Sequence, residues 1–244
     1  VGEELHIDML AVTHKGQNKD IFVKLAQKAW ETCKRPLVLR SDDPEALAEA
    51  AQAVKGSNSV LSAATPETAE QLVQAAKENG HALALTTPDL NQMVALTADL
   101  KQKNFNDLVL QFQTHSLAEQ FQVNSIARRA ALKDNYKALG YPALRFLADE
   151  GSDDLLDTTM SAVTEICKYG GIVVFPFFDA AQMAALMTLR LNIFTDPQKP
   201  IQVEPKLYPV GEPEPDAPVF VTTNFSLTYF IVSGEIENSG TSAW

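Results

Sequence analysis

The amino-acid sequence predicts an α/β fold in which parallel strands alternate with helices. Short apolar runs alternate with longer amphipathic stretches as far as about residue 191. The runs are apolar on both faces, as the strands of a sheet that is covered by helices must be. Their regular spacing leaves room for a helical crossover after each strand, which parallel pairing requires.

Seven runs have the character of strands, and the stretches that follow them have helical spacing. The expected strands are His6–Val12, Pro36–Arg40, Ser59–Ala63, Ala82–Leu85, Asp107–Phe112, Ala143–Leu147 and Gly171–Pro176. The expected helices are Asp20–Cys33, Pro44–Val54, Pro66–Asn79, Pro88–Lys103, Ser116–Ala138, Asp153–Lys168 and Asp179–Leu191. Seven units fit either an open doubly wound sheet or a (β/α)8 barrel that lacks one unit.

Capping residues mark several of these helices. A capping side chain precedes a proline at Asp43–Pro44, Thr65–Pro66 and Thr87–Pro88, which predicts three helix starts. Gly56, Gly80 and Gly140 follow helical stretches and are expected to end them.

Composition excludes several classes of function. The formal net charge is -11 and the sequence pI is near 4.8, so an acidic surface would repel nucleic acid. The most apolar run, Gly170–Phe178, is too short for a membrane span. The two cysteines, Cys33 and Cys167, lie far apart, and we expect both to be reduced and structural in a cytoplasmic protein.

The sequence changes character after the last expected helix. Residues 196–217 are rich in proline and acidic residues, which predicts an extended linker between a barrel at residues 1–195 and a second domain. Residues 218–244 open with a strand-like run, Val219–Thr223, and are too few to bury a core of their own. We therefore expect an incomplete second domain.

Long sequence strings resemble one family from end to end. LRLNIFTDPQKPIQVEPKLYPVG (Leu189–Gly211) and PVFVTTNFSLTYFIVSGEIENS (Pro218–Ser239) resemble the large, or gamma, subunit of the corrinoid iron–sulfur protein of the acetyl-CoA synthase system. Its methanogen counterpart belongs to the acetyl-CoA decarbonylase/synthase complex. VGEELHIDMLAV (Val1–Val12), GYP (Gly140–Pro142) and KYGGIVV (Lys168–Val174) are similar to the barrel of the same family.

The resemblance implies a TIM-type barrel that lacks its first strand, followed by the start of a truncated α/β corrinoid-binding domain. In the family, a preceding domain binds a 4Fe-4S cluster through four cysteines. We therefore expect cobalamin and that cluster in the full-length protein, with the cluster ligands absent from this chain. The start at Val1 rather than at Met also suggests a trimmed or partial chain.

The function that the resemblance implies is that of a methyl carrier in carbon fixation. The subunit would accept a methyl group from a methyltetrahydropterin onto Co(I) and pass it to acetyl-CoA synthase. The expected partners are the small subunit, in a heterodimer, the methyltetrahydropterin methyltransferase, and acetyl-CoA synthase/CO dehydrogenase. A D-x-H-x-x-G cobalt-ligating motif is absent, which agrees with cobalamin bound base-off without a protein histidine.

A polar run after the strand-like segment supplies the candidate corrinoid contacts. Short polar side chains there suit the corrin amides, and the apolar residues suit its ring edge. The candidates are Thr222, Thr223, Asn224, Phe225, Ser226, Leu227 and Tyr229. The alternative is that Thr223–Ser226 only caps the following helix.

The expected barrel offers no catalytic set and no metal ligands. Polar residues are expected at the carboxyl ends of its strands, where active sites of such barrels lie. They are Thr13, His14, Lys15, Ser41, Asp42, Asp43, Thr65, Thr86, Thr87, Gln111, Gln113, His115 and Asp149. Of these, His14 and His115 are the plausible acid–base groups. Two further functions stay open: a scaffold that docks partners, with Arg128 and Arg129 as candidate interface charges, and a stand-alone pterin-binding barrel enzyme.

Overall fold

The computed structural model describes residues 6–16, 18–150, 154–168, 170–195 and 201–244. The chain divides into two compact units, Val1–Thr188 and Leu189–Trp244. Residues 196–200, which open the expected linker, lie outside the described residues, as does Asp153 at the start of one expected helix.

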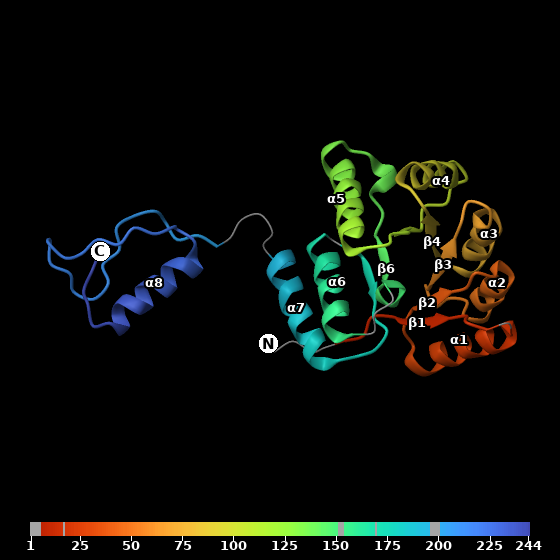
Figure 1. Ribbon diagram of the computed structural model, residues 1–244, viewed down its shortest axis with the longest axis horizontal. Coiled ribbons are helices and arrows are strands. Elements are labelled where there is room, and N and C mark those ends of the chain that lie inside the picture. The colour runs from red at the N-terminus through yellow and green to blue at the C-terminus, as the bar shows by residue number, and fades with distance from the viewer. Residues whose placement is uncertain (1–5, 17, 151–153, 169, 196–200) are drawn as a thin grey trace. The chain divides into compact units, whose positions relative to one another are not determined.

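The first unit is built on parallel strands that pair in sequence order (Figure 1). A five-stranded sheet contains β1 Leu10–Thr13, β2 Leu37–Arg40, β3 Val60–Ala64, β4 Ala82–Thr87 and β5 Leu108–Phe112. A two-stranded sheet contains β6 Leu144–Phe146 and β7 Ile172–Val174. A parallel bridge between Leu110 and Ala143 joins β5 to the chain entering β6. The predicted α/β fold with parallel strands is confirmed.

Helices follow the strands and cover their outer side (Figure 1). They are α1 Lys19–Cys33, α2 Pro44–Ala53, α3 Ala69–Asn79, α4 Leu90–Gln102, α5 Leu117–Lys133, α6 Leu155–Cys167 and α7 Ala180–Thr195. Two short 3-10 helices, η1 Lys137–Leu139 and η2 Leu147–Glu150, flank β6. Within the described ranges no strand pairing joins β7 to β1, so the structure does not show a closed barrel.

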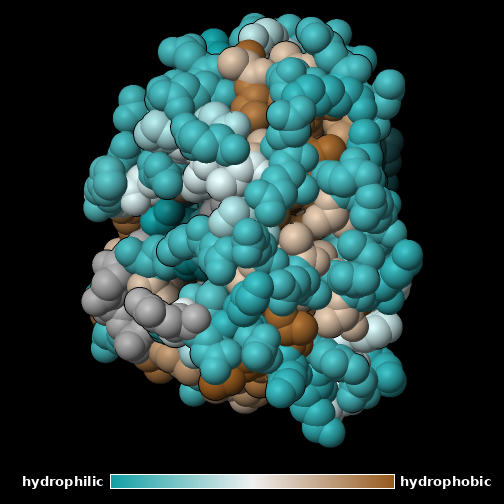
Figure 2. Space-filling view, turned by 90° about the vertical axis from the view of Figure 1, so that its right-hand side faces the viewer, coloured by the Kyte–Doolittle hydropathy of each residue, from teal (hydrophilic) through white to brown (hydrophobic). Residues whose placement is uncertain are grey.

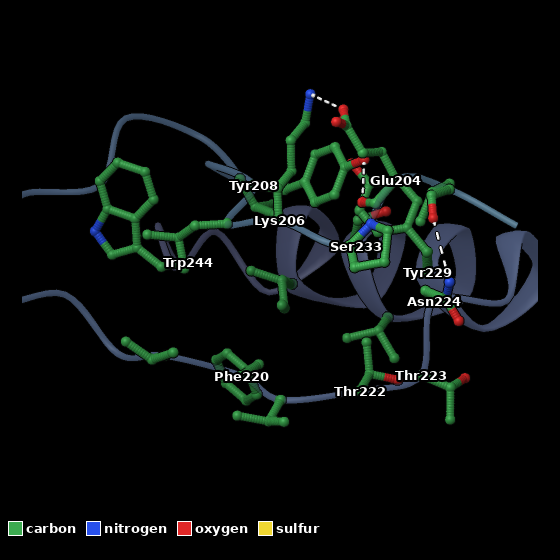
Figure 3. Close-up of a pocket in the computed structure, with 18 residues that line it drawn as sticks. Glu204, Lys206, Tyr208, Phe220, Thr222, Thr223, Asn224, Tyr229, Ser233 and Trp244 are labelled. Atoms are coloured by element: carbon green, nitrogen blue, oxygen red, sulfur yellow. Dashed lines mark hydrogen bonds and ion pairs between the residues drawn. The ribbon is translucent and has the colours of Figure 1, made fainter.

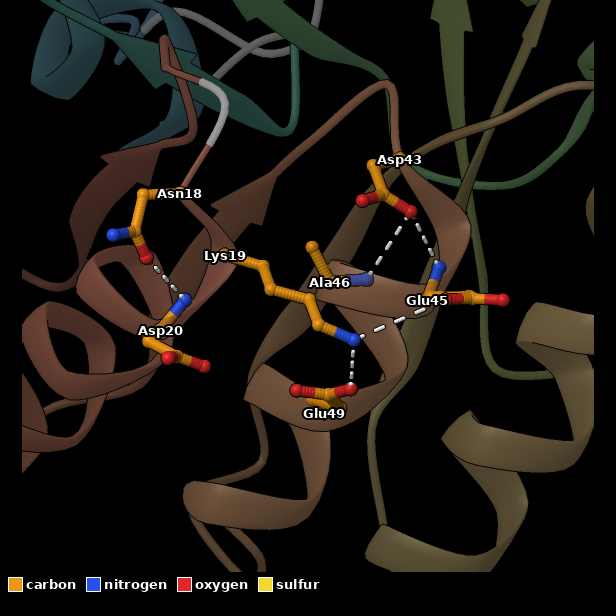
Figure 4. Close-up of polar contacts among 7 residues, drawn as sticks. All are labelled: Asn18, Lys19, Asp20, Asp43, Glu45, Ala46 and Glu49. Carbon is orange, nitrogen blue, oxygen red and sulfur yellow. Dashed lines mark hydrogen bonds and ion pairs between the residues drawn. The ribbon is translucent and has the colours of Figure 1, made fainter.

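One of the three proline-marked helix starts is confirmed. Asp43 accepts hydrogen bonds from the N–H groups of Glu45 and Ala46, and Pro44 is the first residue of α2 (Figure 4). The same region holds the contact between α1 and α2, where the Lys19 ammonium lies 2.6 Å from the Glu49 carboxylate. That carboxylate raises the pKa of Lys19.

The other two predicted starts are wrong. Thr65 forms a turn with Thr68, whose hydroxyl accepts from the Thr65 N–H, and α3 begins three residues after Pro66 at Ala69. Thr87 still belongs to β4, and Asp89 caps α4 through the N–H groups of its first turn. In the first case a turn continues past the proline, and in the second the strand runs up to it, so each helix begins later than expected. Of the three glycines, Gly56 and Gly80 have φ of 82° and 75°, the left-handed geometry expected after a helix.

The strands in the middle of the five-stranded sheet bury both faces. Leucines on the outer side, such as Leu39, Leu61 and Leu85, pack against the helices. Val38 and Val109 face the inner side, where a second apolar cluster lies. The surface over the helices is mainly hydrophilic, with apolar side chains exposed in small groups (Figure 2).

The second unit is small and contains α8 Ser226–Asn238 as well as the last residues of α7. Its core consists of Val210, Ile236 and Ala243, with Val232 packed against them. Val210 and Ala243 exchange two backbone hydrogen bonds that close the unit. Neither the expected linker nor an incomplete second domain is tested by this arrangement, so both stay predictions.

His81, just before β4, is buried, with 3% of its surface exposed, and its side chain bonds to the chain before β3 and to α2. Its Nδ1 accepts from the Ser59 N–H at 3.2 Å, so the proton resides on Nε2, which donates to the Ala51 carbonyl at 2.9 Å. Burial lowers the pKa of His81, and the bond to Ala51 opposes this effect only in part. The folded protein therefore holds a neutral imidazole.

This histidine makes stability depend on pH. Below a pH of about 6.5 the unfolded chain binds a proton at this ring that the folded chain does not bind, so stability falls as pH falls toward the lower folded-state pKa. We expect His81→Gln to be less stable near neutral pH but to show a flatter decline in that window. Urea unfolding at about pH 5 and about pH 7.5 measures the difference. The exposed His115→Gln is the matched control and should keep the wild-type slope; an unchanged slope in His81→Gln would contradict the assignment.

Candidate functional site

Polar side chains lie inside the sheet of the first unit at the carboxyl ends of its strands. Arg40 pairs in register with both Thr13 and Ser62, and Thr86 pairs with Gln111. Each lies two residues beyond an inner-face position, so it points to the same side as the inner apolar cluster. The Ser62 hydroxyl donates to Gln111 Oε1 at 2.7 Å, which joins β3 to β5 across β4.

Arg40 is held from two sides at this end of the sheet. Its guanidinium lies 2.7 Å from the Asp149 carboxylate and stands 4.4 Å from the centre of the Phe146 ring. Both charged side chains are partly exposed. The ion pair therefore contributes little to stability but fixes the arginine over the inner cluster.

His14 and Ser41 form a second polar pair next to Arg40. His14 Nδ1 lies 2.9 Å from Ser41 Oγ, which also accepts from the Asp43 N–H, and the His14 ring stacks on Phe22. His14 Nε2 and Thr86 Oγ1 are buried without a hydrogen-bond partner in the part of the chain that the structure describes. Ser41 is 3% exposed, and His14 is partly buried.

Apart from His14 and Ser41, the candidate residues at the strand ends fall into three groups. Thr13, Thr86 and Gln111 lie on the inner side and Asp149 joins them through Arg40. Asp43, Thr65 and Thr87 take part in helix capping or turns. Lys15, Asp42, Gln113 and His115 are exposed. The described residues contain no group of three or more His, Cys, Asp or Glu side chains that could hold a metal ion.

The second candidate site is a cavity of about 330 Å³ within the second unit. Figure 3 shows Tyr208 and Lys206 on one side of it, Phe220, Thr222 and Thr223 on the other, and α8 between them. Tyr208 donates to the Glu204 carbonyl at 2.9 Å, and its ring packs 4.7 Å from that of Tyr229. The cavity thus combines aromatic walls with short polar side chains.

Four of the seven predicted corrinoid contacts line this cavity: Thr222, Thr223, Asn224 and Tyr229. Phe225, Ser226 and Leu227 do not line it, because the chain turns there into α8. Among the lining residues that the sequence did not predict, Lys206 and Tyr208 come from the proline-rich segment and Trp244 is the last residue, and no local pattern marked them.

Two expectations about this polar run are wrong. Val219–Thr223 is not a strand. The Phe220 N–H donates to the Trp244 carbonyl and the Trp244 N–H donates to the Pro218 carbonyl, but no ladder of strand pairing follows, and Val221 is 94% exposed. The alternative that the run merely caps the helix also fails, because Phe225 is the N-cap of α8 and makes no side-chain capping bond. The Thr222 and Thr223 hydroxyls are therefore not used to start the helix.

Comparisons with known proteins agree on a family. The family model described as CO dehydrogenase/acetyl-CoA synthase delta subunit matches residues 1–244. The chain is 32% identical to the corrinoid/iron-sulfur protein large subunit of Moorella thermoacetica over 239 residues, 98% of this chain and 53% of that protein. It is 29% identical to the acetyl-CoA decarbonylase/synthase complex subunit gamma of Methanocaldococcus jannaschii over 264 residues, 100% of this chain and 54% of that protein. The chain thus spans about half the length of these curated relatives.

Solved structures support the fold alone. The 7,8-dihydropteroate synthase of Vibrio fischeri ES114 aligns with a TM-score of 0.56 at 11% identity, covering 79% of this chain and 81% of that chain. Dihydropteroate synthases are TIM barrels, so the strand and helix order of the first unit is that of a barrel whose closure the structure does not show. In the described part of the chain no helix has the length and apolar character needed to cross a membrane.

The bond between Ser62 and Gln111 should carry a measurable coupling energy. Ser62→Ala leaves the buried Gln111 oxygen without its donor, which costs roughly 1–3 kcal/mol of unfolding free energy. Gln111→Leu should cost less when Ser62 is already alanine, so the double variant is more stable than the sum of the single effects predicts. Urea unfolding of the four proteins measures this. Strict additivity would show that the two side chains do not interact.

Proposed function

Because the chain belongs to the CO dehydrogenase/acetyl-CoA synthase delta subunit family, we propose that it is part of the large subunit of a corrinoid iron–sulfur methyl carrier. The match over residues 1–244 carries this proposal, together with relatives whose names contain corrinoid/iron-sulfur protein and acetyl-CoA decarbonylase/synthase. A corrinoid, when bound, supplies the cobalt that accepts a methyl group from a methyltetrahydropterin and gives it up to acetyl-CoA synthase.

The cavity of the second unit fits one part of a corrinoid. Its volume of about 330 Å³ is near the lower end of small-molecule pockets and is smaller than a whole corrin with its amide side chains. The Thr222 and Thr223 hydroxyls and the Asn224 amide can each donate and accept hydrogen bonds, as peripheral carboxamides require. Further contacts would come from other parts of the full protein.

These polar groups are available for a ligand. In the described chain, neither threonine hydroxyl makes a hydrogen bond, and the Asn224 side-chain amide makes only a long one, 3.5 Å, to the Val203 carbonyl. Tyr208 and Tyr229 provide aromatic surface beside them. In our proposal Thr222, Thr223 and Asn224 orient the edge of the corrin while the tyrosines exclude water from it.

The iron–sulfur cluster needs ligands from elsewhere in the protein. The chain has two cysteines, Cys33 and Cys167, and both are free thiols on separate helices. Cys167 is exposed at the end of α6. Four thiolates for a 4Fe-4S cluster would therefore be supplied by residues outside this chain.

A second candidate function is that of a scaffold barrel that docks other subunits. Ala11 pairs with Val38 and so faces the inner side of the sheet, yet it is exposed. The edge of β1 away from β2 has no described pairing, and another segment or subunit could cover it. This role is compatible with methyl transfer, and we propose the small subunit, the methyltransferase and acetyl-CoA synthase/CO dehydrogenase as partners of a cytoplasmic protein.

The corrinoid proposal predicts a graded loss of cofactor. In the intact protein, Thr222→Val and Asn224→Leu should each weaken corrinoid binding by roughly 2- to 10-fold, because each removes a hydrogen bond at the corrin edge. Equilibrium binding followed by visible absorption measures the change. Thr241→Val is the matched control, since Thr241 is exposed in the same unit outside the cavity.

Two results would contradict the proposal at different levels. Intact wild-type protein without corrinoid absorption would refute the methyl-carrier function. Normal binding in Thr222→Val and Asn224→Leu, with corrinoid present, would refute only the cavity as part of the site.

A further inference from the structure

The first unit contains a second cavity, of about 400 Å³, on the outer side of its sheet. It lies between β5 and the helical layer formed by α4, α5 and η1, and η1 packs against both of these helices. Leu110, Phe112 and Leu139, which are buried in the outer core, form an apolar floor. This cavity is distinct from the strand ends and from the second unit.

The charge around this cavity is opposite to that of the protein. Four cationic side chains line it, Lys101, Arg128, Lys137 and Lys168, and the lining contains no Asp or Glu. The whole chain carries 31 acidic against 20 basic residues. A cavity with four cations and no acid therefore departs strongly from the average composition of this protein.

The positions of two of these cations at helix ends explain part of the positive charge, but not why four cations gather around one cavity. Lys101 lies in the last turn of α4 and Lys168 caps the end of α6, where a cation suits the helix dipole. Lys137 belongs to η1 and Arg128 to the middle of α5. Four separate elements thus direct positive charge to one cavity.

The acids of the surrounding elements do not neutralise these lysines. Lys101 and Lys137 make no ion pair with a described residue, and Lys168 stands 4.1 Å from the Phe121 ring centre. Glu165 on α6 is buried and does not line the cavity. Its carboxylate accepts from Asn124, whose own oxygen accepts from Gln120.

We propose that this cavity binds a small organic phosphate monoester, with its apolar body on the floor and its phosphate among the lysines. The volume lies within the range of small-molecule sites, roughly 300–1,000 Å³. Several cations around one cavity favour a dianion over a single carboxylate. A hollow of this size also favours a small molecule over a protein partner, whose stable interface needs about 1,200 Å² or more.

Equilibrium dialysis of the intact protein with fluorescent 1-naphthyl phosphate tests this site. We expect saturable binding that weakens as salt is added, because the attraction is electrostatic. The neutral 1-naphthol, which has the same ring, should bind much more weakly. Equal binding of the two probes would overturn the proposal, since the cavity would then recognise only apolar surface.

Charge-reversal variants test whether 1-naphthyl phosphate binds in this cavity. Lys101→Glu and Lys137→Glu should each weaken 1-naphthyl phosphate binding by roughly tenfold. Lys133→Glu changes the net charge equally on an exposed part of α5 that does not line the cavity, and it should alter affinity by less than about twofold. Equal weakening by all three would mean a general charge effect and would overturn the site. So would exclusion of the probe from the natural complex with partner subunits, because the cavity would then be an interface.

Discussion

The rest of this structure depends on one constraint: the strands in the middle of the parallel sheet have to bury both faces. Strand residues therefore alternate between two apolar clusters, one under the helices and one inside the sheet. Polar side chains can appear only where a face reaches the carboxyl end of a strand. Ser62, Thr86 and Gln111 each occupy the first inner position beyond the apolar layer. The constraint that stabilises the sheet thus also decides where its polar groups gather.

On its outer side, β6 is an exception to this apolar packing, because polar side chains are buried there. Arg145 is 6% exposed at an outer-face position and donates to Thr114, whose hydroxyl donates to Gln120. Gln120 in turn donates to Asn124, which donates to Glu165 on α6. A chain of hydrogen bonds with opposite charges at its two ends thus replaces leucine packing between β6, α5 and α6. This polar packing holds α5 over the cationic cavity, whose wall includes Asn124.

Local signals in the sequence predicted the order of elements because each strand and helix has its own periodicity. They failed where two signals compete within a few residues. Thr65–Pro66 and Asp43–Pro44 look alike in sequence, yet only Asp43 caps a helix, because the Thr65–Thr68 turn postpones α3. The run at Val219–Thr223 has strand composition, but no neighbouring strand pairs with it and it stays exposed. Pairing is a property of the whole fold, and a single segment cannot reveal it.

The two cavities also differ in how far the sequence could predict them, because one is formed by residues close together in the chain and the other by residues far apart. Thr222 and Asn224 are near neighbours in the chain, so a polar run marked that site before the structure placed it. Lys101 and Lys137 are far apart in sequence, and each resembles an ordinary surface lysine. Other lysines of the chain do pair with acids, as Lys19 and Lys103 do. Cations that gather around one apolar floor repel one another. Such repulsion is relieved when an anion binds, which is why the convergence of charge, rather than any single residue, identifies the cavity as a site.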